Sequence, residues 1–88
     1  MKIVDGYMLK NIANAYVVVP VGSRSVDFSA IISVNETGAF IWRQLEKDTT
    51  PEAILHNMLE EYEVTEAQAK EDLDTFIQKL REAELLQE

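Results

Sequence analysis

The sequence predicts an α+β fold in which a three-stranded antiparallel sheet precedes three helices. From position 26 to position 34 every second residue is apolar, which is the period of a half-buried strand. From position 38 to position 45 the apolar residues instead recur at helical spacing. Asn35 stands at the change of period, where its side-chain oxygen can accept from the free N–H groups of a first helical turn.

Two further strands are expected before this junction. Tyr7–Ile12 can form the first strand, and residues 15–19 can form the second because three consecutive valines favour extended backbone. Asn14 is a suitable turn residue between them, and Pro20 and Gly22 interrupt the second run. Short connections between consecutive strands predict an antiparallel meander, with residues 26–34 as its third strand.

Three helices are expected after the sheet, the first of them over residues 36–47. Thr50 can cap the second helix, with Pro51 in the first turn, where a missing N–H costs nothing. Thr65 and Gln68 can form a capping box at the start of the third. A short turn between the second and third helices is typical of a helix-turn-helix, so the arrangement is predicted to be winged-helix-like.

The core is expected to centre on Trp42 and on one face of the third helix. The apolar residues of that face are Ala69, Leu73, Phe76, Leu80 and Ala83. The last two leucines, Leu85 and Leu86, are expected to pack the end of this helix against the sheet. Phe40 lies next to the buried stripe of the first helix, where it can either cover the edge of the core or remain a contact residue.

Length and composition indicate one domain over residues 1–88, with a modest core. Hydrophobic residues make up 47% of the 88 residues. The chain has no cysteine, which excludes disulfides and thiolate chemistry and suits a reducing compartment. We recognise neither an apolar run of bilayer length nor the pattern of a signal peptide, so a cytoplasmic location is expected.

Charge is distributed unevenly along the chain. Residues 1–34 contain three basic and two acidic side chains, whereas residues 35–88 contain five basic and fourteen acidic ones. The helical part therefore has a formal charge of −9 within a total of −8. An anionic surface repels phosphate backbones and anionic lipid, so neither nucleic acid nor a membrane is expected as a partner. The acidity also serves solubility, and this can be its whole explanation.

Side chains for catalysis are not arranged in any recognisable motif. His56 is the sole histidine, and a metal site needs several converging ligands, so no metal and no other cofactor is expected. The three glycines are scattered and form no phosphate-binding loop, and no serine has a histidine base with an orienting partner. The sequence predicts a protein that is not an enzyme.

Several short motifs, in this order, resemble the PqqD-like family, also called the RiPP recognition element. Val-Asn-Glu-Thr-Gly-Ala-Phe-Ile-Trp at residues 34–42 resembles the family's strand–helix junction. Thr-Pro-Glu-Ala-Ile at residues 50–54 resembles the start of its second helix, and Glu-Tyr-Glu-Val at residues 61–64 the end of that helix. The third helix matches at Asp72, Leu73, Phe76 and Leu80 and in the closing Leu85-Leu86. One departure is Glu84, where the family commonly has a glycine that can end the helix.

The resemblance implies a peptide chaperone without catalysis of its own. Members of this family bind the leader segment of a ribosomally synthesised precursor peptide and present it to a modifying enzyme. That enzyme is often a radical iron–sulfur maturase, a cyclase or a leader protease, and the pathway makes a peptide natural product or a PQQ-type cofactor. The resemblance also implies that the leader adds as a strand beside the third strand and packs toward the third helix.

The candidate peptide-binding residues lie on these two elements. The strand residues are Phe28, Ser29, Ala30, Ile31, Ile32 and Ser33, where small serines leave an edge open to an incoming strand. The helix residues are Lys70, Asp74, Ile77 and Arg81, which form one stripe beside the buried face. In this interpretation Ile77 points outward and receives an apolar anchor, while Lys70 or Arg81 receives acidic leader side chains. The alternative is an ordinary helix boundary with salt-bridge partners.

Two other functions and one assembly remain open at this point. A winged-helix DNA-binding regulator would use the third helix for recognition, but that helix is acidic and DNA readers normally carry a basic footprint. A small regulatory subunit could bind some other peptide through the same edge. An unpaired strand can also pair with its own copy, which leaves a symmetric homodimer or strand exchange open.

Overall fold

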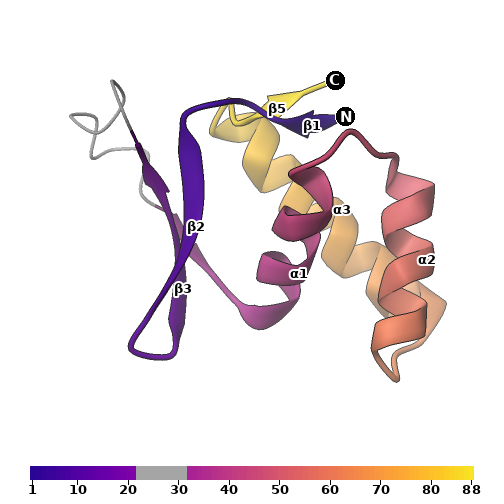
Figure 1. Cartoon of the computed structure of the whole chain (residues 1–88). Helices are drawn as coiled ribbons and strands as arrows, with labels where there is room; N and C mark the ends of the chain where they lie inside the picture. Colours follow the sequence, from indigo (N-terminus) through magenta and orange to yellow (C-terminus); the bar gives the residue numbers. More distant parts are fainter. Residues whose placement is uncertain (22–31) are drawn as a thin grey trace.

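The computed structural model describes residues 1–21 and 32–88, and its sheet lies on one side of the three helices (Figure 1). The elements in chain order are β1 (Lys2–Ile3), β2 (Tyr7–Ile12), β3 (Ala15–Pro20), β4 (Ile32–Val34), α1 (Glu36–Leu45), α2 (Pro51–Glu61), α3 (Glu66–Glu82) and β5 (Leu86–Gln87). Strands β2, β3 and β4 form one antiparallel sheet in that order, which confirms the predicted meander. Of the predicted third strand, residues 32–34 form β4 and residues 26–31 lie outside the described residues.

The hairpin between β2 and β3 has a two-residue turn. Ile12 pairs with Ala15, and the two residues between them, Ala13 and Asn14, have φ values of 52° and 68°. Positive φ at both central positions is the geometry of a type I′ turn, whose twist matches that of the flanking strands. Asn14 adopts this conformation readily, whereas Ala13 adopts it at some cost in strain.

All three helices begin at the predicted caps. The side chains of Asn35, Thr50 and Thr65 each accept a hydrogen bond from the backbone N–H three residues later, at 2.7, 3.2 and 3.1 Å. The predicted capping box at α3 is only half formed, because the side-chain amide of Gln68 donates to Asp72 Oδ1 at 2.9 Å. Helix α1 ends at Leu45, two residues before the predicted end.

Helix α1 lies at the centre of the molecule, between the sheet and α2 (Figure 1). Trp42 is 1% exposed and belongs to one core that joins the sheet and the helices, as predicted. Phe40 covers the edge of this core: it is half-buried, and its ring meets that of Tyr62 edge-on at a centroid distance of 5.4 Å. The remaining buried apolar residues of the helices are Ala39, Ile41, Leu45, Ile54, Met58, Ala69, Leu73, Phe76, Ile77 and Leu80.

The two ends of the described chain pair with each other. Ile3 of β1 lies opposite Leu86 of β5 in a two-stranded sheet separate from the meander. Leu85 is fully buried in the core, and Leu86, which belongs to this small sheet, is half-buried and packs against the same core. Strands of two residues are too short to produce a period in the sequence, and neither was predicted.

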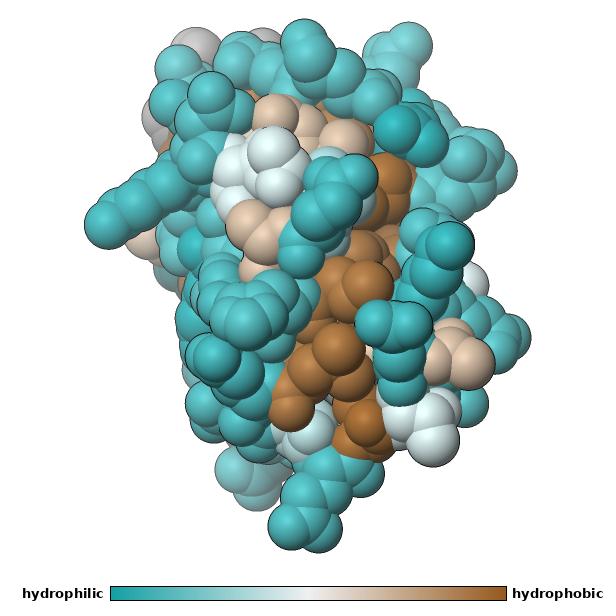
Figure 2. Space-filling view, turned by 90° about the vertical axis from the view of Figure 1, so that its right-hand side faces the viewer, coloured by the Kyte–Doolittle hydropathy of each residue, from teal (hydrophilic) through white to brown (hydrophobic). Residues whose placement is uncertain are grey.

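The face occupied by α2 keeps some apolar surface. Figure 2 shows a stripe of hydrophobic side chains running down this face between hydrophilic ones. Leu55 and Leu59 of α2 are half-buried and pack against the core from the outside. Within residues 1–21 and 32–88, no helix is both long and apolar enough to cross a bilayer.

Candidate functional site: a groove between β4 and α3

Strand β4 is an edge strand among the described strands. Ser33 lies opposite Val17 of β3, and the carbonyl oxygen of Ser33 accepts a hydrogen bond from Lys79 Nζ of α3 at 3.0 Å. This carbonyl therefore points away from β3. Because the N–H and C=O of one residue in an antiparallel strand point the same way, the N–H of Ser33 is also directed to the open side. Ser33 thus presents its N–H as a donor and its C=O as an acceptor to an incoming strand.

A groove of about 220 Å³ runs between α3 and the end of β4 with the first turn of α1, next to this edge. Val34 lies on the sheet side and Phe76 on the helix side, and each is 8% exposed. The first turn of α1 can approach Val34 and Phe76 this closely because residue 38 is glycine. A Cβ atom there would lie 2.5 Å from Val34 Cγ1 and 2.9 Å from Phe76 Cε1. Gly38 therefore sets the distance between α1, β4 and α3 at the site.

The groove has charges of opposite sign at its two ends. Lys79 lies beside Ser33 at one end. Glu71 and Asp72 line the same groove two turns earlier on α3. The chemistry offered is therefore a strand edge, an apolar floor, a cation at one end and carboxylates at the other. This combination suits an extended peptide.

The predicted strand residues are only partly within the described chain. Phe28, Ser29, Ala30 and Ile31 lie outside the described residues. Ile32 is half-buried in β4, and Ser33 is exposed at the edge.

The predicted helix stripe is corrected by the structure. Lys70, Asp74 and Arg81 are exposed, but Ile77 is 4% exposed and belongs to the core, so its predicted outward direction is wrong. Because α3 packs against both α1 and α2, its buried face is broad enough to include two adjacent residues, Phe76 and Ile77.

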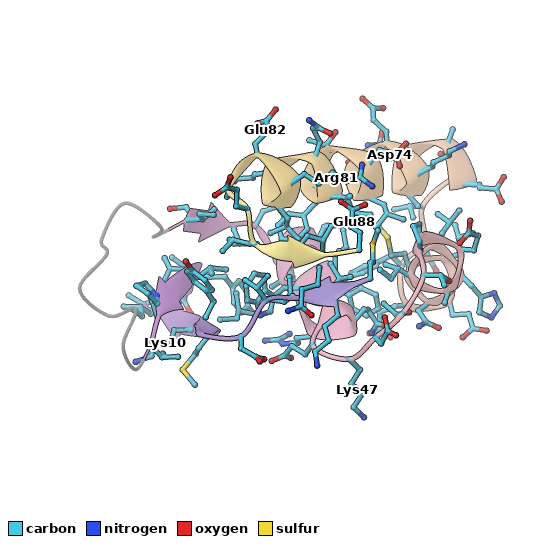
Figure 3. All side chains as sticks on the ribbon, turned by 90° about the horizontal axis from the view of Figure 1, so that it is seen from above. Lys10, Lys47, Asp74, Arg81, Glu82 and Glu88 are labelled. Atoms are coloured by element: carbon cyan, nitrogen blue, oxygen red, sulfur yellow. The ribbon has the colours of Figure 1, made fainter. Side chains whose placement is uncertain are left out.

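None of the four residues of this stripe lines the groove. Arg81 pairs with Glu88 at 2.6 Å, and Figure 3 shows these two side chains together beside β5 while Glu82 points away. Their hydrogen bond lowers the pKa of the Glu88 carboxyl and raises that of the Arg81 guanidinium. Lys70 does not line the groove, and Asp74 lies only on the outer surface of α3 near Lys79.

The residues of α3 that do line the groove were missed as a set. They fall at helical spacing along one side of α3, at the margin of its buried face, and are Glu71, Asp72, Thr75, Phe76 and Lys79. The buried face of α3 has a row of residues on each side. The prediction chose the row that includes Arg81, which contacts Glu88 in the C-terminal segment. Helical spacing alone could have listed both rows, but it contains no signal for the one that faces β4.

Metal-binding groups do not gather in the described parts of the chain, where no three His, Cys, Asp or Glu side chains could share an ion. His56 is exposed on α2, and its Nε2 lies 3.0 Å from Glu60 Oε1, one turn later.

The chain matches the family model for coenzyme PQQ synthesis protein D (PqqD) over residues 15–86. It belongs to the PqqD family. The match includes the strand–helix junction and the groove, and it confirms the resemblance recognised in the sequence. No curated protein sequence matches the chain significantly.

Two solved structures are similar to this PqqD-family chain. TbiB1 in complex with the TbiA(beta) leader peptide is 28% identical, with a TM-score of 0.76 over 99% of this chain and 95% of that one. Lasso peptide synthetase B1 complexed with the leader peptide is 21% identical, with a TM-score of 0.69 over 92% and 89% of the two chains. The second likeness shows the fold alone, and both agree with the α+β arrangement predicted from the sequence.

Proposed function

We propose that this chain binds the leader segment of a ribosomally synthesised precursor peptide by strand addition and presents it to a modifying enzyme. The observation that carries the proposal is the open edge of β4 beside a groove formed with α3. Membership in the PqqD family supports it. So does the likeness to TbiB1, whose structure holds a leader peptide.

The groove supplies what strand addition needs. The N–H and C=O of Ser33 can pair with the main chain of the peptide, which gives affinity without regard to sequence. Val34 and Phe76 form an apolar floor on which a leader side chain can rest. Phe76 thus takes the part that the sequence analysis assigned to Ile77.

The partner that follows is the enzyme that modifies the precursor. A radical iron–sulfur maturase, a cyclase or a leader protease would supply the chemistry, since no catalytic arrangement is found in the described residues. The domain over residues 1–88 would act as the recognition module. Because the precursor is made on ribosomes, binding would take place in the cytoplasm.

The test is a titration of the 15N-labelled protein with the leader segment of the precursor encoded beside it, followed by amide shifts. The largest shifts are expected in β4 and on the side of α3 that carries Phe76. Ser33→Pro removes the outward donor, and loss of one such hydrogen bond weakens binding by about 3- to 10-fold. Ser33→Ala is the matched control, because it removes the hydroxyl and keeps the N–H.

Two results would contradict the proposal. One is a set of shifts confined to α1 or to the surroundings of His56, with β4 unmoved. The other is equal affinity of the proline and alanine variants for the same leader, provided that both give the amide spectrum of the folded protein.

A further inference from the structure

Lys79 occupies the position that a bound strand would need. Its ammonium donates to the outward carbonyl of Ser33 at 3.0 Å, across 46 residues of sequence. The side chain is exposed, and no carboxylate of the described residues forms a salt bridge with it. Lys79 is thus a cation at the rim of the groove, and it is hydrogen-bonded to the carbonyl oxygen of Ser33 at the strand edge.

We infer that Lys79 determines which leaders bind, by selecting an acidic side chain at the position that pairs beside Ser33. The inference rests on the proposed function and specifies the class of peptide. When a strand adds to β4, its N–H takes the carbonyl of Ser33, and Lys79 loses that acceptor. An aspartate or glutamate on the arriving strand restores a partner, with a charge-assisted hydrogen bond in place of a neutral one.

The side chain is suited to this exchange. A lysine ammonium stands at the end of a flexible four-carbon stem, so it can leave the carbonyl and stay at the rim. A basic side chain at the same peptide position would meet a like charge instead. Lys79 would therefore favour peptides with an acidic side chain at this position and disfavour peptides with a basic one.

The opposite end of the groove fixes where the acid can lie. Asp72 and Lys79 are seven residues apart on α3, which corresponds to about 10 Å along the helix axis and to about three residues of an extended peptide. Because side chains of a strand alternate between its two faces, a leader displaced by two or four residues keeps its acidic side chain on the same face and brings it toward Glu71 and Asp72. Charge at the two ends thus selects one register.

The experiment is a selection from a display library of random 12-residue peptides, run in parallel on the wild type and three variants. The wild type is expected to enrich Asp or Glu at one position of the aligned peptides. Lys79→Glu is expected to enrich Lys or Arg there, and Lys79→Met to show no charge preference. Lys70→Glu makes the same charge change on α3 away from the groove and should reproduce the wild-type pattern.

A synthetic copy of one wild-type peptide then measures the effect. Its Glu→Gln form should bind the wild type about 3- to 10-fold more weakly, and should bind Lys79→Met as well as the acidic form does. Retention of the acidic preference by Lys79→Met would overturn the inference. So would peptides that shift β4 amides without any charge preference, although the proposed function would then stand. Failure of every selected peptide to shift β4 amides would overturn both.

Discussion

Glu84 adopts the conformation in which a glycine would be expected, and its replacement offers a measurable gain in stability. The N–H of Leu85 donates to the carbonyl of Leu80 at 2.9 Å, and the N–H of Glu84 donates to that of Arg81 at 3.0 Å. These two bonds form a Schellman motif at the end of α3, in which Glu84 has a φ of 59°. The motif turns the chain so that Leu85 enters the core beside Leu80, and both are at most 1% exposed.

The size of the gain in stability follows from the backbone conformation of residue 84. A side chain in the left-handed region costs about 1–2 kcal/mol relative to the right-handed region, and glycine does not meet this cost. Glycine also lowers the free energy of unfolding by about 0.4–1 kcal/mol, because it increases the conformational freedom of the unfolded chain. Glu84→Gly should therefore stabilise the fold by about 0.5–1 kcal/mol, or raise Tm by a few degrees in a domain of this size.

Thermal and urea denaturation followed by circular dichroism would measure the change. Glu84→Ala is the matched control, because it removes the same charge from the C-terminal end of α3 but keeps a Cβ atom. The difference in unfolding free energy between these two variants measures the cost of the left-handed conformation at residue 84. A glycine variant no more stable than the alanine variant would refute it.

Three further predictions concern packing and titration. Gly38→Ala should destabilise the fold by about 1–3 kcal/mol in urea, because its Cβ would lie 2.5 Å from Val34 Cγ1; an unchanged midpoint would contradict the close packing. Leu80→Ala should cost about 2–5 kcal/mol in the same assay, since Leu80 is 1% exposed, and a smaller loss would place it outside the core. Burial, and next the charge of Glu36, raise the pKa of Tyr62, so its near-ultraviolet titration should lie above that of the urea-unfolded chain. This contribution to stability is complete below the ordinary tyrosine pKa of about 10 and is lost as pH rises through the raised value; coincident titrations would disprove it.

The starts of the three helices were predictable because they depend on short-range contacts. Asn35, Thr50 and Thr65 cap α1, α2 and α3 as predicted, because each cap bonds to a backbone group only three residues away. Asn14 marked the hairpin turn for the same reason. Glu84 was recognised as an unusual residue for a helix end, although its left-handed conformation became visible only in the structure.

The candidate site was predictable only in part. The family motifs and the period of the third strand pointed to β4 and α3, and both elements border the groove. The sequence analysis then placed Ile77 on the outer surface of α3 and chose Lys70 and Arg81 as the binding cations. The structure buries Ile77 and brings Lys79 to Ser33 instead.

By itself the sequence determined the order of β2, β3, β4 and the three helices, together with the helix caps, because these depend on contacts between residues near one another in the chain. The family could be recognised because its motifs are short and local. The tertiary structure decided which flank of α3 faces the open edge, and it paired β1 with β5 across the whole described chain. Ser33 and Lys79 are 46 residues apart, and their contact depends on how α3 packs against α1, α2 and the sheet together. A helical period records how wide a buried face is, but not which neighbour covers each of its sides.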